Sequence, residues 1–159
     1  MRRLFATAWT IWLLDFATKT WAISSLSSQP RKIIGSLLQF TLVKNSGAAF
    51  SLATGFTIFF TLLAFVVVAT VTYFASRITS RGWSIAVGLL LGGVLGNLTD
   101  RIFRSPGFFN GHVIDWIELP HWPVFNLADS AICIAALISI ILSYRNIPPI
   151  TPLTDSQVR

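Results

Sequence analysis

The chain has 159 residues, of which 53% are hydrophobic and only 11% are charged. Soluble globular proteins carry about 25% charged residues, so this composition excludes a soluble globular domain and indicates one integral membrane domain. The net charge of +6 is spread along the chain rather than gathered into a dense basic stripe, which excludes a nucleic-acid-binding surface. Cys133 is the only cysteine, so the chain cannot form an intramolecular disulfide.

A helix needs about 20 predominantly apolar residues to cross the hydrocarbon core of a bilayer. Four windows of the sequence meet this requirement, at about residues 4–23, 56–75, 84–102 and 125–144. The first window is also compatible with a cleaved signal peptide, since Arg2 and Arg3 precede it. Asp15 and Lys19 interrupt its end, however, and no clear small-x-small cleavage site follows, so we expect an uncleaved first span.

A short basic turn, residues 76–83, separates the second and third windows and contains Arg77 and Arg81. Because short cytoplasmic loops are enriched in Lys and Arg, we expect this turn on the cytoplasmic side. The total numbers of Lys and Arg near the helix ends do not decide the orientation by themselves. With the turn inside, both termini are cytoplasmic, and the two long connections lie on the outer side.

The two outer connections differ in their residue types. Residues 33–50 contain β-branched and aromatic residues with little helical periodicity, which predicts a small antiparallel sheet, a β-cradle over about residues 30–52. The connection 103–124 contains several prolines and glycines, so we expect an irregular loop there. The proline-containing segment 147–159 is expected to be a disordered tail after a single membrane domain, residues 1–146. The predicted fold is an all-α polytopic membrane protein with four transmembrane helices and a small β-cradle between helices 1 and 2.

Acidic residues are few, and their positions carry most of the functional signal. The six are Asp15, Asp100, Asp115, Glu118, Asp129 and Asp155. All except Asp155 lie in or beside long apolar segments. An ionised carboxylate at the centre of a bilayer costs roughly 2.5–3.5 kcal/mol, so each of these residues needs a partner, a water-filled cavity or a function.

Polar residues gather at the outer ends of the third and fourth windows. Two sets have helical spacing: Asn97, Asp100 and Arg101 in the third window, and Asn126 and Asp129 in the fourth. Asp115 lies between the two sets, in the outer connection that joins these windows. Asp115 can therefore face Asp129 across a small cleft at the membrane surface.

Two carboxylates in close contact do not both ionise easily, so at neutral pH they tend to share a proton. The ionised carboxylate can take a proton from a bound water while the protonated one polarises a carbonyl, which is the chemistry of aspartic peptidases. Asp115 and Asp129 are therefore candidates for a catalytic pair. The sequence has no H-E-x-x-H or G-x-S-x-G motif, and no metal or other cofactor is expected.

Structural explanations compete with the catalytic one. Asp15 and Lys19, four residues apart, are expected to form an ion pair that makes membrane insertion tolerable, and Asp100 is expected to pair with Arg101. Asn126 can cap the fourth helix or form hydrogen bonds between helices. The pattern alone also leaves open a small proton-coupled transporter or channel that uses intramembrane aspartates, and a non-catalytic assembly subunit.

Five motifs, in order along the chain, resemble those of the bacterial lipoprotein signal peptidase (signal peptidase II) family over about residues 4–144. They are D-F-A-T-K at 15–19, K-N-S-G-A-A-F-S at 44–51, G-G-V-L-G-N-L-T-D-R at 92–101, V-I-D-W at 113–116 and F-N-L-A-D-S at 125–130. Each motif is weak alone, whereas five in order on a chain of this length are specific. Trp116 stands where the family more often has Phe, and Val94 and Ala135 replace commoner Ala and Gly.

The resemblance implies an aspartyl endopeptidase of the bacterial cytoplasmic (inner) membrane, with its active site at the periplasmic face. Its expected substrates are prolipoproteins, cleaved on the N-terminal side of a diacylglyceryl-modified cysteine, and globomycin is the expected inhibitor. The resemblance assigns catalysis to Asp115 and Asp129. It assigns substrate or inhibitor binding to Asn45, Gly47, Asn97, Arg101 and Asn126, and supporting roles to Asp15, Lys19 and Asp100. We expect a monomer that contacts prolipoprotein substrates and membrane lipids and needs no cofactor.

Overall fold

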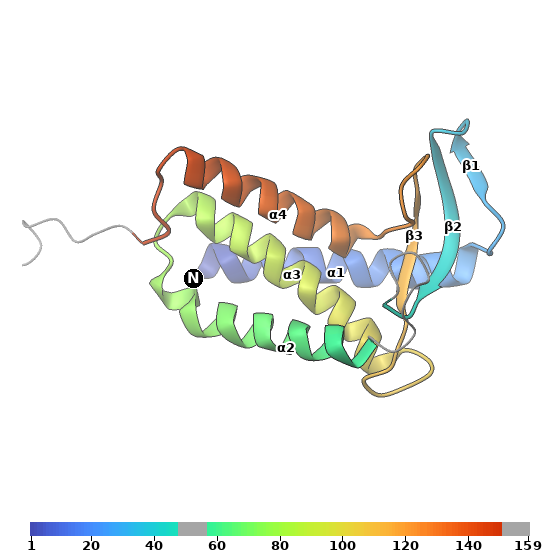
Figure 1. Ribbon diagram of the computed structural model, residues 1–159, viewed down its shortest axis with the longest axis horizontal. Helices are drawn as coiled ribbons and strands as arrows, with labels where there is room; N and C mark the ends of the chain where they lie inside the picture. The colour runs from blue at the N-terminus through green and yellow to red at the C-terminus, as the bar shows by residue number, and fades with distance from the viewer. Residues whose placement is uncertain (48–56, 151–159) are drawn as a thin grey trace, which may run out of the picture.

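The computed structural model describes residues 1–47 and 57–150. Its elements in chain order are α1 (Arg2–Ser25), β1 (Arg31–Ile34), β2 (Leu38–Asn45), α2 (Thr57–Phe74), the 3-10 turn η2 (Ala75–Arg77), α3 (Arg81–Phe103), β3 (Val113–Glu118) and α4 (Leu127–Tyr144). The long helices run side by side, and the strands lie together at one end of the helix bundle (Figure 1). The protein is therefore mostly helical, with a small sheet at one end.

Three helices in the described part of the chain are long and apolar enough to cross a membrane: Thr57–Arg77, Arg81–Phe103 and Leu127–Tyr144. They coincide with the expected spans 56–75, 84–102 and 125–144, with ends shifted by a few residues. The expected first span, 4–23, lies within α1, which is long enough to cross. Asp15 and Lys19 lie inside α1, however, and lower its hydropathy below that of the other three helices.

Helix α3 lies between α1 and α4 because its glycines let both neighbours approach closely. A Cβ atom added at Gly92 would lie 2.6 Å from the Ala8 carbonyl oxygen of α1, and one added at Gly93 would lie 2.5 Å from the Ala128 carbonyl oxygen of α4. Small residues allow this close contact of helix backbones in a membrane protein. The polar residues of α3 are thereby held next to those of α1 and α4.

The strands form one antiparallel sheet in the order β1-β2-β3. The hairpin of β1 and β2 confirms the predicted antiparallel strands, and the part of the expected β-cradle from residue 48 to 52 lies outside the described residues. In the second pairing, Val43 of β2 lies opposite Asp115 of β3. The sheet therefore joins the connection between α1 and α2 to the connection between α3 and α4.

The prediction of an irregular loop throughout 103–124 is wrong for Val113–Glu118, which forms β3. The prolines and glycines on which the prediction rested all lie outside this run. Within it, Val113, Ile114 and Ile117 are β-branched, and such residues favour strands. Strand β2 supplies the partner that this segment needs.

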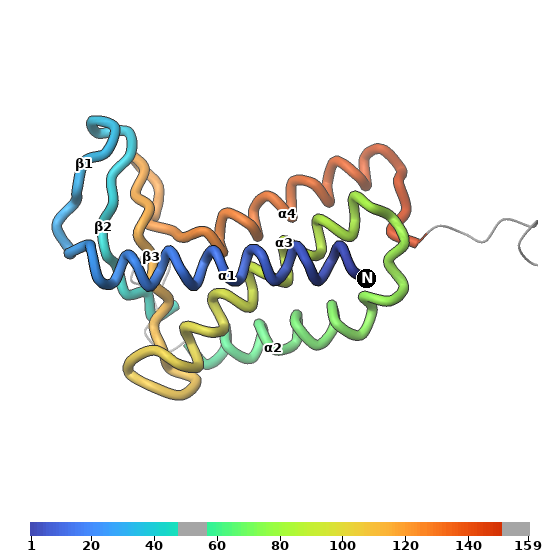
Figure 2. The backbone as a smooth tube through the Cα atoms, turned by 180° about the vertical axis from the view of Figure 1, so that it is seen from behind, coloured from blue at the N-terminus to red at the C-terminus, as the bar shows by residue number. Residues whose placement is uncertain are grey.

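The N-terminus and the end of α4 lie at the end of the bundle away from the sheet (Figure 2). At this end the Trp83 indole donates a hydrogen bond to the Ile147 carbonyl at 2.7 Å, and the Thr79 and Ser80 amides donate to the Pro149 carbonyl. The segment expected to be disordered from residue 147 therefore begins with residues bound to the first turn of α3 and to the connection before it. Residues 151–159 lie outside the described residues.

Candidate active site

Asp115 lies in the middle of β3 and is only 2% exposed. One carboxylate oxygen, Oδ2, accepts a hydrogen bond from Asn45 Nδ2 at 2.9 Å, and the other, Oδ1, accepts one from Asn126 Nδ2 at 2.6 Å. Burial raises the pKa of the Asp115 carboxyl to about 7, and the negative charge of Asp129 adds to the rise. The two amide hydrogen bonds act in the opposite direction, because they stabilise the ionised form.

Asp129 is held at the first turn of α4 by a capping box with Asn126. Asn126 Oδ1 accepts a hydrogen bond from the Asp129 amide at 2.9 Å, and Asp129 Oδ2 accepts one from the Asn126 amide at 3.2 Å. This reciprocal pair satisfies amide groups that the helix itself leaves without partners. The expectation that Asn126 caps the fourth helix is confirmed, and the same side chain also contacts Asp115.

Asn97 of α3 completes the connection between the two carboxylates. Its Nδ2 donates to Asp129 Oδ1 at 2.8 Å, while its Oδ1 accepts from Asn126 Nδ2 at 3.2 Å. Asp115 and Asp129 are therefore joined through the amides of Asn126 and Asn97.

A buried ion cluster supports Asn97 from the side of α1. Lys19 Nζ lies 2.7 Å from Asp15 Oδ2 and 2.9 Å from Asp100 Oδ2, and all three side chains are essentially inaccessible. Lys19 Nζ also donates to Asn97 Oδ1 at 2.9 Å. The predicted Asp15–Lys19 ion pair is confirmed, and it extends to the amide that contacts Asp129.

The expected pairing of Asp100 with Arg101 is wrong. Asp100 forms its ion pairs with Lys19 and Arg104, and its Oδ2 accepts a hydrogen bond from the Ile114 amide of β3 at 3.1 Å. Residues four apart on a helix share a face, whereas adjacent residues point in different directions. The i, i+4 spacing of Asp100 and Arg104 was the sequence signal for this partner, and the sequence analysis missed it.

Arg101 instead points toward Gly47 and the side of α2. Its guanidinium carbon lies 5.7 Å from the centre of the Phe60 ring, and its buried Nη1 has no hydrogen-bond partner among the described residues. Gly47 has φ +106°, and a Cβ added there would lie 3.6 Å from Nη1 and 3.2 Å from the Phe60 ring. The glycine amide donates to Asn45 Oδ1 at 2.8 Å. A larger residue at position 47 would therefore crowd the guanidinium and strain the backbone.

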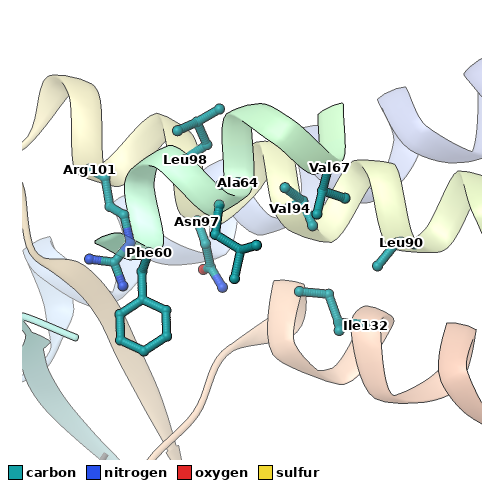
Figure 3. A pocket seen from close by; sticks show the side chains of 10 residues that line it. Phe60, Ala64, Val67, Leu90, Val94, Asn97, Leu98, Arg101 and Ile132 are labelled. Atoms are coloured by element: carbon teal, nitrogen blue, oxygen red, sulfur yellow. The ribbon is translucent and has the colours of Figure 1, made fainter. Parts of the chain in front are cut away.

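An apolar cavity of about 310 Å³ leads from these polar residues along the membrane-crossing helices. Most of its wall is apolar and comes from α2, α3 and α4: Phe60, Leu63, Ala64, Val67, Leu90, Val94, Leu98 and Ile132. Asn97 and Arg101 also line it, and they lie toward the end near the sheet, away from Leu90 (Figure 3). We call this cavity the apolar groove. It offers an apolar ligand a path from the membrane-crossing region to Arg101 and to Asn97, which hydrogen-bonds to Asp129.

Comparison with known proteins gives a consistent result. Residues 7–145 match the family profile described as Signal peptidase (SPase) II. The lipoprotein signal peptidase of Streptomyces coelicolor is 48% identical over 147 residues, which cover 92% of this chain and 72% of the relative. That of Mycobacterium tuberculosis H37Rv is 44% identical over 144 residues, covering 90% of this chain and 71% of the relative.

Two solved structures, each described as a bacterial membrane enzyme, have a similar fold. The first has a TM-score of 0.79 at 24% identity and covers 97% of this chain and 94% of its own. The second has a TM-score of 0.80 at 25% identity and covers 92% and 95%. The family profile and the relatives each cover most of the chain, so this multi-pass membrane protein belongs to the signal peptidase II family, the peptidases that remove signal peptides from prolipoproteins.

Proposed function

We propose that the chain hydrolyses the peptide bond on the N-terminal side of a diacylglyceryl-modified cysteine, with Asp115 and Asp129 as its catalytic residues. One observation carries this assignment. Two carboxylates from separate elements, β3 and α4, are linked by the amides of Asn126 and Asn97, and Asn97 also lines an apolar groove between membrane-crossing helices. A prolipoprotein has matching parts, since its apolar signal helix and acyl chains lie in the bilayer beside a polar scissile bond.

The environments of the two carboxylates assign them different roles. Asp115 is the more deeply buried, and its pKa of about 7 lets it hold a proton at neutral pH. Asp129 accepts hydrogen bonds from Asn97 and the Asn126 amide, which hold its carboxylate in a fixed orientation. In the proposed reaction Asp129 takes a proton from water, the oxygen of this water attacks the scissile carbonyl carbon, and Asp115 donates its proton to the carbonyl oxygen.

The tetrahedral intermediate then breaks its carbon–nitrogen bond. Asp129 gives the proton that it took from water to the departing amine, and Asp115 recovers a proton from the intermediate's hydroxyl group as the carbonyl reforms. Both carboxyl groups return to their starting states, so the cycle needs no metal ion or other cofactor. Loss of water from the groove strengthens each of these electrostatic interactions.

Substrate binding is assigned to Asn45, Gly47, Asn97, Arg101 and Asn126. In three of these residues the side-chain amide already donates a hydrogen bond to one of the carboxylates: Asn45, Asn97 and Asn126. Arg101 has an unpartnered Nη1, so it is the donor best able to bind a substrate carbonyl. The apolar groove would hold the signal peptide or an acyl chain, and globomycin would occupy the same position as an inhibitor.

We infer that α1 is a fourth membrane span in a single domain, residues 1–146. The two charges inside α1, Asp15 and Lys19, form an ion pair with each other, which lowers the cost of placing α1 in the bilayer. The chain would lie in the bacterial cytoplasmic (inner) membrane as a monomer, with both termini in the cytoplasm. The sheet would then form a β-cradle at the periplasmic face, where the diacylglyceryl group of the substrate enters.

The substrate assignment is tested by a cleavage assay with the full chain in detergent micelles. One prolipoprotein carries the diacylglyceryl group on its cysteine, and its matched control has the same sequence without the lipid. We expect cleavage of the lipidated form directly before the cysteine, little cleavage of the control, and inhibition by globomycin. Equal cleavage of both forms, or proton flux through reconstituted vesicles without any cleavage, would contradict the proposal.

A further inference from the structure

We propose that a second cavity binds the phosphate-bearing headgroup of an anionic phospholipid, at a site separate from the two carboxylates. This cavity has a volume of about 310 Å³. Its polar wall includes Lys44, Arg104 and His112, and its apolar wall consists of Ile23, Phe103 and Ile114. We call it the cationic pocket. It lies where the ends of α1 and α3 meet the sheet.

The cationic pocket is on the opposite face of the sheet from Asp115. Lys44 of β2 pairs with Ile114 of β3, while Val43 pairs with Asp115. Successive side chains of a strand point to opposite faces, so Lys44 and Ile114 lie on one face and the Asp115 carboxylate on the other. A ligand in the cationic pocket would therefore leave the carboxylates accessible to substrate.

The loop that brings His112 beside Arg104 is held firmly against the end of α3. The Gly111 amide donates to the Arg101 carbonyl at 3.0 Å, and the His112 amide donates to the Ser105 carbonyl at 3.1 Å. A Cβ added at Gly111 would lie 2.8 Å from the Arg104 carbonyl oxygen, so only glycine permits this approach without a shift of the backbone. The polar groups of the pocket are thus preorganised.

Charges around the pocket favour an anion. Arg104 pairs with Asp100 through Nε, but its Nη2 is buried and has no hydrogen-bond partner among the described residues. The ion cluster has no net charge, because the two carboxylates of Asp15 and Asp100 are neutralised by two cations, Lys19 and Arg104. Lys44 is exposed and adds a further positive charge, and the His112 imidazole can donate a hydrogen bond. These groups match a phosphate diester.

Position within the membrane favours a lipid over free phosphate. Phe103 ends α3, a membrane-crossing helix, and is 79% exposed, while Ile23 near the end of α1 is 40% exposed. Phospholipid headgroups lie at this level, and an arginine and a lysine there attract an anionic headgroup electrostatically. Acyl chains can contact Phe103 and Ile23 while the phosphate reaches Lys44 and Arg104. Free phosphate has no apolar part that could contact the apolar wall.

The test measures lipid bound to the purified full chain in neutral detergent by native mass spectrometry. Dioleoyl phosphatidylglycerol is the probe, dioleoyl phosphatidylcholine is the neutral-lipid control, and inorganic phosphate is the free-anion control. We expect selective retention of phosphatidylglycerol by the wild type. The Lys44→Gln/His112→Asn variant should retain it about five-fold less, because one lysine near a membrane surface contributes about that factor. Lys32→Gln, an exposed lysine of β1 outside the pocket, should retain it as the wild type does.

Three results would overturn the proposal: equal retention of phosphatidylglycerol by the double variant and the wild type, equal retention of the two lipids, or displacement of the lipid by inorganic phosphate. Peptidase activity in neutral detergent should be unchanged in the double variant, which also shows that it is folded. Because the binding measurement does not involve proteolysis, its outcome is independent of the assignment of Asp115 and Asp129 as catalytic residues.

Discussion

The Asn126 side chain donates a hydrogen bond to Asp115 at 2.6 Å while its backbone amide and its Oδ1 hold Asp129 in the capping box of α4. A single asparagine therefore contacts both carboxylates and starts the helix that carries one of them. Any displacement of α4 relative to β3 would change the distance between the two proposed catalytic groups. The local stability of the helix and the geometry of the site depend on the same residue.

Filling the apolar groove should impair substrate binding. Ala64 of α2 lines the groove, so Ala64→Phe would occupy space that an apolar part of the substrate needs. We expect KM for a lipidated prolipoprotein to rise by about ten-fold, since loss of one buried apolar contact costs that much affinity. Val66→Phe is the matched control, because Val66 is on the same helix but is 61% exposed. An equal effect of both variants on KM would contradict the role of the groove.

Lys19 should be needed for activity as well as for stability. Lys19→Met leaves the carboxylates of Asp15 and Asp100 without their shared cation, and breaking a buried ion pair costs roughly 3–5 kcal/mol. We expect a lower melting temperature in detergent. The Asp15→Asn/Lys19→Met variant removes one charge of each sign, so much of the stability should return.

Activity of that double variant separates a positioning role from a purely structural one. Without the Lys19 ammonium, Asn97 Oδ1 loses a donor, and its amide can turn so that Nδ2 no longer faces Asp129. We expect kcat to stay low while the melting temperature recovers. A stable double variant that cleaves prolipoprotein at the wild-type rate would show that Lys19 does not position Asn97.

The pH dependence of kcat/KM should report the protonation of Asp115. If this residue is the general acid, activity should fall as the pH rises above its pKa of about 7. Asn45 donates to the Asp115 carboxylate and thereby lowers its pKa. Asn45→Ala removes this stabilisation of the ionised form, so the pKa of Asp115 should rise and the basic limb should move to higher pH. A basic limb that stays in place or moves to lower pH would contradict the assignment.

Much of the fold follows from local sequence. The runs that form α2, α3 and α4 are long and apolar, so their existence and approximate ends could be predicted from composition alone. The β1–β2 hairpin was indicated by its β-branched and aromatic residues. Strand β3 was not predicted because prolines and glycines flank it on both sides, although the run from Val113 to Glu118 contains none.

The arrangement of the site could be predicted only in part. Helical spacing correctly put Asp15 beside Lys19, and the position of Asn126 before an apolar run correctly indicated a helix cap. The hydrogen bond from Asn45 to Asp115 joins residues 70 positions apart, and the apolar groove combines three helices. The first contact depends on the pairing of β2 with β3, and the second on the packing of α3 against α2 and α4. No local sequence pattern encodes either one.

The most direct test of the proposed mechanism compares cleavage of a diacylated prolipoprotein by the wild type, Asp115→Asn, Asp129→Asn and Glu118→Gln. Glu118 is the matched control, since it is the other acid on β3 and bonds to Thr41 rather than to the amides around Asp115. We predict that each aspartate variant folds and cleaves about a thousandfold more slowly, while Glu118→Gln remains active. Cleavage at the wild-type rate by a folded Asp115→Asn or Asp129→Asn variant would contradict the account.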